Sequence, residues 1–209
     1  MRHCAKKTPN SKNSWKNYAT HRTCYWFYYH FREIKKSSSI VTTVEEAKQL
    51  QDWVEESASG KVRFELLWKG TRDGFGASVF HTKCNNKGPT LTIIKSNNDK
   101  IFGGYTSQSW GFGGGSWTSK HDATAFIYSL SYKTKCATQK DTNSIWDSSG
   151  YGPIFGDGYD IAIYDNCNAR SDNYCNPSTY ALPAGKDNTF LAGSSSFTVK
   201  EIEVYAVMK

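Results

Sequence analysis

The sequence predicts an α+β protein that is mostly β, built as a two-layer antiparallel β-sandwich with a few flanking helices. Three observations support this prediction. Six separate runs have the length and the apolar or alternating pattern of strands. A polar turn of hairpin length separates two of them, Leu91 to Lys95 and Ile101 to Tyr105. Only short stretches of the chain show the spacing of an amphipathic helix.

The first clear element is a helix that begins after Thr43. Thr43 and Glu46 form a capping box, in which each side chain accepts a hydrogen bond from the other residue's backbone N–H. Gly60 supplies a stop for this helix. The stripe expected to dock on the following strands comprises Ala47, Leu50 and Val54, and Trp53 flanks it.

The expected strands are residues 62–68, 91–95, 101–105, 125–130, 160–164 and 201–207. Residues 96–100, Ser-Asn-Asn-Asp-Lys, form the polar hairpin turn. In the last run, one set of alternate residues is aliphatic, and the other set is Glu201, Glu203 and Tyr205. We therefore expect one face of this sheet to be buried and the other to contact water.

The stretch LLWKGTRDGFGASVFHTKC, residues 66–84, is predicted to be a sharp corner between a strand and a helix. Asp73 is placed to cap the helix that follows, Arg72 to hold a neighbouring carboxylate or carbonyl groups, and Gly74 to permit the turn. His81 and Cys84 are three residues apart, a spacing at which a catalytic pair can meet. Because Cys84 lies on the apolar stripe, a buried thiol beside a surface imidazole is the favoured interpretation.

The net charge of +7 is concentrated at the N-terminal end. Residues 1–43 contain nine lysines and arginines and one acidic residue, whereas the rest contains 17 basic and 18 acidic residues. We expect a basic, aromatic N-terminal extension over residues 1–43 and a nearly neutral domain over residues 44–209. No specific nucleic-acid partner is expected. Since no stretch approaches roughly 18 continuous apolar residues, no transmembrane segment is expected and the protein should be soluble.

Motifs for catalysis or metal binding are missing from the sequence. The six cysteines form no C-x-x-C pair, the glycine-rich segments do not continue as a P-loop, and the aspartates lack calcium-loop spacing. Reduced thiols are expected, with a Cys167–Cys175 bridge left open as the alternative. We therefore expect no catalytic residue, no metal and no cofactor.

Several long motifs in one order resemble the TLDc domain, the module of the oxidation-resistance and nuclear-receptor-coactivator-like proteins. They are LLWKGTRDGFGASVFHTKC, GPTLTIIKS, IFGGYTS, AFIYSL, YGPIFGDGYDIAIYDN and FLAGSSSFTVKEIEVYAV. The resemblance covers nearly four-fifths of the chain and implies a two-sheet antiparallel sandwich. Asp157 and Tyr159 stand where many relatives have Gly and His, which weakens the case for an imported metal or redox site.

The resemblance implies a non-enzymatic module that binds and regulates the V-ATPase through its peripheral subunits, or that supports resistance to oxidative stress. The expected location is the cytoplasm, at the periphery of an organelle membrane or on a large intracellular assembly. An alternative is a structural component of a cytoskeletal or ciliary filament anchored by the basic tail. The partner-binding candidates are Trp110, Trp117, Asp165 and Asn166, with core packing as the alternative for the two tryptophans.

Overall fold

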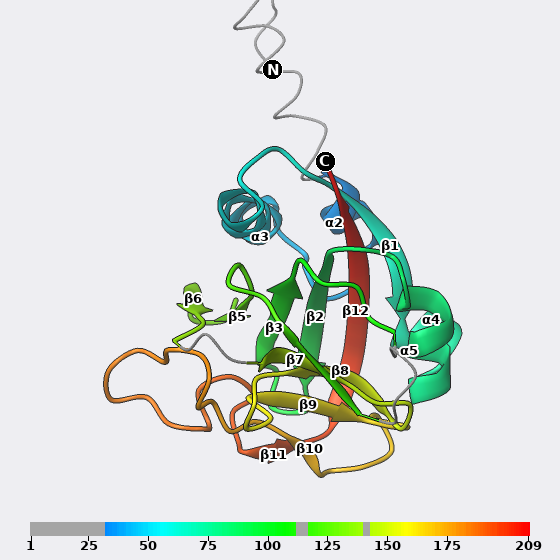
Figure 1. The fold of residues 1–209 in the computed structure, drawn as a ribbon, viewed down its shortest axis with the longest axis vertical. Helices are drawn as coiled ribbons and strands as arrows, with labels where there is room; N and C mark the ends of the chain where they lie inside the picture. Colours follow the sequence, from blue (N-terminus) through cyan, green and yellow to red (C-terminus); the bar gives the residue numbers. More distant parts are fainter. Residues whose placement is uncertain (1–31, 112–116, 140–142) are drawn as a thin grey trace, which may run out of the picture.

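A computed structural model describes residues 32–111, 117–139 and 143–209 as two antiparallel sheets, with two helices over the first sheet and two at its edge beside β1 (Figure 1). The aromatic run at residues 25–31 therefore lies outside the described residues. The first sheet has the order β1-β12-β2-β3-β5-β6. Its strands are β1 (Arg63–Lys69), β2 (Thr90–Ser96), β3 (Ile101–Thr106), β5 (Phe126–Ser129), β6 (Thr134–Ala137) and β12 (Val199–Met208).

The second sheet has the order β11-β10-β9-β8-β7-β4, and its strands cross those of the first sheet in Figure 1. Its strands are β4 (Thr118–His121), β7 (Asn143–Asp147), β8 (Tyr151–Phe155), β9 (Ile161–Tyr164), β10 (Asn173–Tyr174) and β11 (Ser196–Phe197). The two antiparallel sheets confirm the predicted sandwich. The short strands β4, β6, β7, β8, β10 and β11 were not among the strands expected from the sequence.

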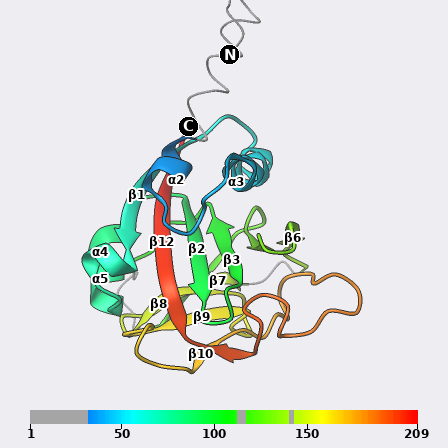
Figure 2. The ribbon, with the colours of Figure 1, turned by 180° about the vertical axis from the view of Figure 1, so that it is seen from behind.

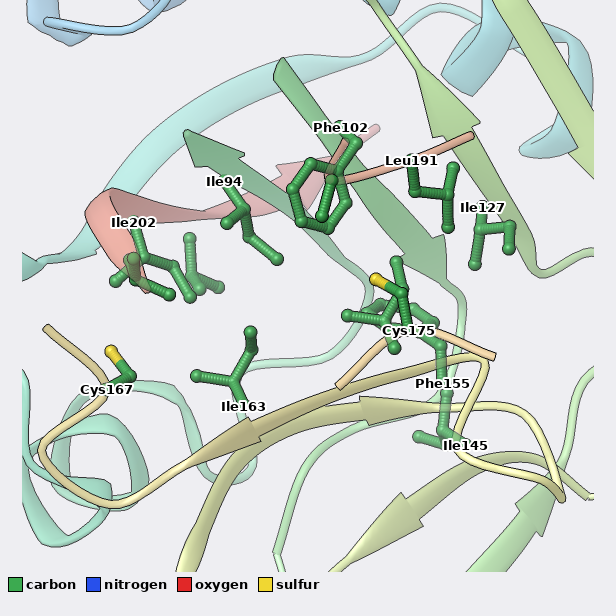
Figure 3. Close-up of a cluster of buried hydrophobic side chains, with 14 of the residues drawn as sticks. Ile94, Phe102, Ile127, Ile145, Phe155, Ile163, Cys167, Cys175, Leu191 and Ile202 are labelled. Atoms are coloured by element: carbon green, nitrogen blue, oxygen red, sulfur yellow. The ribbon is translucent and has the colours of Figure 1, made fainter. Parts of the chain in front are cut away.

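The core between the sheets consists of aliphatic, aromatic and thiol side chains from both layers (Figure 3). Ile94, Phe102 and Ile202 come from the first sheet, and Phe155 and Ile163 come from the second. All five side chains are fully buried. Burying one such side chain contributes roughly 1.5–3 kcal/mol, so this layer is a major source of stability.

The helices in the described residues are α2 (Arg32–Ser37), α3 (Val44–Ser57), α4 (Gly70–Asp73) and α5 (Ala77–Cys84). The capping box of α3 is confirmed: Glu46 N donates to Thr43 Oγ1 and Thr43 N donates to Glu46 Oε2, each at 3.1 Å. The helix ends at Ser57, before the stop expected at Gly60, because Ser59 already adopts a positive φ of 52°.

Helices α2 and α3 cover the face of the first sheet that is turned away from the second sheet (Figure 2). Ile34 of α2 and Leu50 of α3 pack in one cluster with Leu91, Tyr128 and Tyr205 of the strands. Because Ile34 is buried in this cluster, the packed unit begins earlier than the boundary expected at residue 44.

The prediction of one water-exposed face on the last strand was wrong. Glu203 and Tyr205 of β12 are completely buried, and Glu201 is 7% exposed. Glu203 Oε1 accepts a hydrogen bond from Ser39 N at 2.8 Å and lies 3.2 Å from Lys69 Nζ. The polar side chains of β12 therefore face a second packed layer in which hydrogen bonds and an ion pair offset the cost of removing them from water.

Candidate functional site

The outer face of the second sheet carries five neighbouring aromatic side chains, which we call the aromatic row: Trp117, Trp146, Tyr151, Tyr159 and Tyr164. Ring centroids of Trp117 lie 5.0 Å from Tyr151 and 6.3 Å from both Trp146 and Tyr159. Tyr151 and Tyr164 are 4.8 Å apart. Trp117 is 41% exposed and Tyr159 38% exposed, so large aromatic surfaces reach solvent.

Strand register places the row on the face opposite to the core. Ile145 pairs with Phe155 in the inter-sheet core, and the next pair, Trp146 and Ile154, therefore points outward. Tyr151 pairs with Tyr164 on the same side, and Ala162 pairs with Ile154. Ile154 and Ala162 are nevertheless buried, at 0% and 1% exposure. In the described residues no helix lies over this face (Figure 1), and the cross-strand partner of Ile154 is Trp146.

A polar loop adjoins the row beyond Tyr164. The guanidinium carbon of Arg170 lies 4.5 Å from the centroid of the Tyr164 ring, and Arg170 Nη2 donates to Asp172 Oδ2 at 2.6 Å. This loop encloses an open depression of about 750 Å³ whose lining includes Asp165, Asn166, Asn168, Arg170, Asp172 and Thr198. The predicted candidates Asp165 and Asn166 therefore lie next to the row that contains Trp117.

Trp110 does not belong to this surface, so its prediction as an exposed anchor is corrected. Its side chain is completely buried and packs edge-on against Phe80 and Phe155. Its indole N–H donates to Thr90 Oγ1 at 2.8 Å. The core-packing alternative is therefore the observed one. Inside the sandwich the ring is buried among other aromatic side chains, and its single N–H donor is hydrogen-bonded.

The corner at Arg72, Asp73 and Gly74 is structural, although Asp73 does not cap α5. Arg72 Nη2 donates to Asp73 Oδ2 at 2.7 Å and to Leu67 O at 3.1 Å, as predicted for its role. The hydrogen bond from Arg72 lowers the pKa of Asp73 from 3.8 to about 2. Asp73 Oδ2 accepts from Lys69 N, and Gly74 has φ of 101°. The cap of α5 comes instead from Asp165, which accepts from Ala77 N at 2.7 Å.

Residues 35–208 match the family described as the TLDc domain. The chain belongs to this family. A segment of 51 residues is also 45% identical to Interferon-induced protein 44 of Homo sapiens and 43% identical to that of Pan troglodytes. Each match covers 24% of this chain and 11% of the relative, so it shows similarity over a short segment only. TLDc domains are, as a family, generally non-catalytic interaction modules associated with oxidative stress.

The thiols of this TLDc domain in the described residues are free, and all of them are buried: Cys84, Cys136, Cys167 and Cys175. Burial raises the pKa of Cys136 to about 11 and that of Cys167 to about 12, and it also raises the pKa values of Cys84 and Cys175. These groups are thiols rather than nucleophilic thiolates at neutral pH. The Cys167–Cys175 bridge is not formed (Figure 3).

His81 is more buried than the surface imidazole expected from the sequence, with a side chain that is 10% exposed. Its Nε2 lies 3.0 Å from Ser148 O and its Nδ1 2.9 Å from Asn85 Oδ1. The imidazole therefore joins α5 to the segment between β7 and β8. Cys84 packs into the inter-sheet core from the same helix.

The aspartates of the TLDc domain serve the fold through hydrogen bonds. Asp160 accepts from the backbone N–H groups of Ser178, Thr179 and Tyr180. Asp157 Oδ1 accepts from Trp146 Nε1 at 3.2 Å and thereby fixes one ring of the aromatic row. Among the described residues, no three His, Cys, Asp or Glu side chains gather as metal ligands, and no helix there has the length and apolarity to cross a bilayer.

Trp117 is the member of the row predicted from the sequence as a partner contact, and the other four were not predicted. The available signal was the alternation on β9, where Ile161 and Ile163 face the core and Tyr164 takes the opposite face. An aromatic residue at a position where an exposed strand normally carries a polar side chain indicates a binding surface.

Proposed function

We propose that this TLDc domain is a non-catalytic interaction module that binds the peripheral subunits of the V-ATPase and thereby supports resistance to oxidative stress. The family supports an interaction role, and the aromatic row supplies the surface. The carrying observation is that two of its rings, Trp117 and Tyr159, expose about two-fifths of their surface on a face that no described helix covers.

The composition of this surface matches that of protein-binding hot spots. Such sites are enriched in Trp, Tyr and Arg because these side chains bury a large area with few rotatable bonds. The row offers two tryptophans and three tyrosines, and Arg170 extends it by stacking on Tyr164. Asp165 and Asn166 adjoin this end, where the rim of an interface carries polar contacts.

The buried thiols and the hydrogen-bonded aspartates support the non-catalytic part of the proposal. A redox or nucleophilic cysteine needs a solvent-accessible thiolate. Each of the four described cysteines is instead at most 1% exposed and has a raised pKa.

The test is co-purification of the full chain with purified V-ATPase, using a matched pair of aromatic variants. Trp117→Ala removes an anchor of the aromatic row. Tyr132→Ala removes an aromatic side chain of similar exposure, 49%, that stacks on Phe190 instead. We expect Trp117→Ala to reduce the bound fraction by about tenfold, in keeping with a hot-spot residue, while Tyr132→Ala binds like the wild type.

Two results would contradict the proposal. Failure of the wild-type chain to bind the pump under any assembly state removes the V-ATPase as partner. Equal binding by wild type and Trp117→Ala, with both variants folded by circular dichroism, removes the aromatic row as the contact surface.

A further inference from the structure

The aromatic row has a geometry that specifies the chemistry of its ligand, and this step rests on the proposed interaction function. Neighbouring rings are inclined rather than coplanar: the planes of Trp117 and Trp146 meet at 68°, those of Trp117 and Tyr151 at 58°, and those of Tyr151 and Tyr164 at 45°. The two most exposed rings, Trp117 and Tyr159, are inclined at 53° with centroids 6.3 Å apart, so they form no flat platform. Flat ligands such as bases stack best on an open ring face, whereas compact, puckered proline rings fit between aromatic side chains.

The tyrosine hydroxyls add donors along the same face. Within the described residues, the hydroxyl groups of Tyr151, Tyr159 and Tyr164 form no hydrogen bond. Burial, with the neighbouring Tyr151 and Asp172, raises the pKa of Tyr164, so its hydroxyl keeps its proton at neutral pH. A polyproline II chain has no internal hydrogen bonds and presents its carbonyl groups outward, which suits a row of hydroxyl donors.

The charge near the row is negative at one end. Asp157 accepts from Trp146 Nε1 and from Asn143 Nδ2, both at 3.2 Å, yet it forms no ion pair among the described residues. At the other end, Arg170 and Asp172 neutralise each other. A cationic side chain on the ligand is therefore attracted to the Asp157 end, and this gives the ligand a preferred direction.

We propose that the aromatic row binds a proline-rich segment in the polyproline II conformation, with an Arg or Lys of that segment placed against Asp157. Prolines pack against the exposed rings of Trp117 and Tyr159, and ligand carbonyls accept from the tyrosine hydroxyls. The segment loses little conformational entropy on binding, because its proline residues are already restricted to this conformation. The aromatic row can therefore bind the proline-rich segment through side chains alone.

The direct test uses a synthetic peptide with two Pro-x-x-Pro turns and one terminal arginine, titrated into the full chain while tryptophan fluorescence and binding heat are recorded. Two control peptides replace every proline by alanine or the arginine by glutamate. We expect micromolar binding of the first peptide and a loss of about tenfold or more in affinity for each control, typical of a lost hot-spot or charge contact.

Variants of the protein locate the contact. Trp117→Ala should weaken binding by about tenfold and Tyr132→Ala should leave it unchanged, as expected for an anchor and a remote ring. Asp157→Asn keeps the acceptor for Trp146 and removes only the charge. It should therefore reduce the preference for arginine over glutamate without abolishing the requirement for proline. Salt should weaken binding to the wild type more than binding to Asp157→Asn.

The inference is overturned if the alanine peptide binds as tightly as the proline peptide, if neither binds, or if Trp117→Ala binds like the wild type. Its outcome is separate from that of the V-ATPase experiment. Pump binding without peptide binding removes the proline-rich ligand and leaves the proposed function standing. Peptide binding without pump binding supports the ligand and removes the V-ATPase as its source.

Discussion

The outer faces of the two sheets of this domain are covered differently. The first sheet is covered by α2 and α3, and Leu91, Tyr128 and Tyr205 on that face are fully buried. The outer face of the second sheet carries the aromatic row and no helix of the described residues (Figure 1), and Trp117 remains 41% exposed. The first arrangement uses helices to remove apolar surface from water. The second leaves apolar surface accessible to another molecule, which is why we assign binding to it.

Strand sequences reflect this difference. Strand β2, TLTIIKS, is buried at every position except Lys95, because it is covered on both faces. Strand β7, NSIWD, has partly exposed positions at Asn143 and Trp146, because no helix of the described residues covers its outer face (Figure 1). A partly exposed tryptophan on an uncovered face lowers solubility, and such residues are typical of binding surfaces. A continuous apolar run, in contrast, is ordinary for a central strand.

The largest effect is expected from Glu203, which joins the first sheet to the segment before α3. Glu203→Ala leaves the Lys69 ammonium and Ser39 N without their buried partner, so the free energy of unfolding should fall by about 3–5 kcal/mol. Urea denaturation measures this loss. Glu203→Gln retains an acceptor and should cost less. A loss below about 1 kcal/mol for Glu203→Ala would contradict a buried polar link on this face.

A matched pair of core variants compares the two coverings directly. Leu50 of α3 and Ile154, the cross-strand partner of Trp146, are both fully buried. Leu50→Ala should lower the free energy of unfolding by about 3 kcal/mol, since helix α3 cannot collapse freely into the space. Ile154→Ala should cost about 2 kcal/mol, because the partly exposed side chain of Trp146 can settle into part of the cavity.

Denaturant titrations of both variants give these losses, and the difference between them is the quantity of interest. A larger loss for Ile154→Ala than for Leu50→Ala would mean that the aromatic row is packed as rigidly as the helical layer. Such rigidity would weaken the argument that the row is a surface prepared for a ligand.

The sequence was sufficient for the elements whose signals are local. The capping box at Thr43 and the hairpin turn at residues 96–100 depend on neighbouring residues, and both are present in the structure. Alternation identified β12 and showed which of its residues share a face. It did not show what covers the opposite face, and for this reason Glu203 and Tyr205 were expected in water although they are buried.

The candidate site was less predictable because it depends on contacts between distant segments. Trp110 and Trp117 flank the same glycine-rich segment, yet one lies in the core and the other in the aromatic row. Asp165 caps α5 although it lies 88 residues after Ala77 in the sequence. Local spacing could indicate only a neighbouring residue, and it therefore predicted Asp73 as the cap. Short strands such as β4 and β8 give too few alternations to fix a face.

The smallest stability effect is expected at Asp165, which joins the polar loop beside the row to the start of α5. Asp165→Asn keeps an oxygen that accepts from Ala77 N and removes only the charge near the helix N-terminus, so the free energy of unfolding should fall by about 0.3–1 kcal/mol. Asp165→Ala also removes the cap and should cost about 1–2 kcal/mol by denaturant titration.

Measuring both the stability and the V-ATPase binding of these two variants separates the capping role of Asp165 from its predicted contact with the partner. If Asp165→Asn binds normally and only Asp165→Ala is impaired, the carboxylate acts through the position of α5. If Asp165→Asn already loses binding while its stability is nearly unchanged, its charge contacts the partner, and the binding surface extends from the aromatic row into the polar loop. No loss of stability in Asp165→Ala would contradict its assignment as the cap, because an unsatisfied helix N–H has a measurable cost.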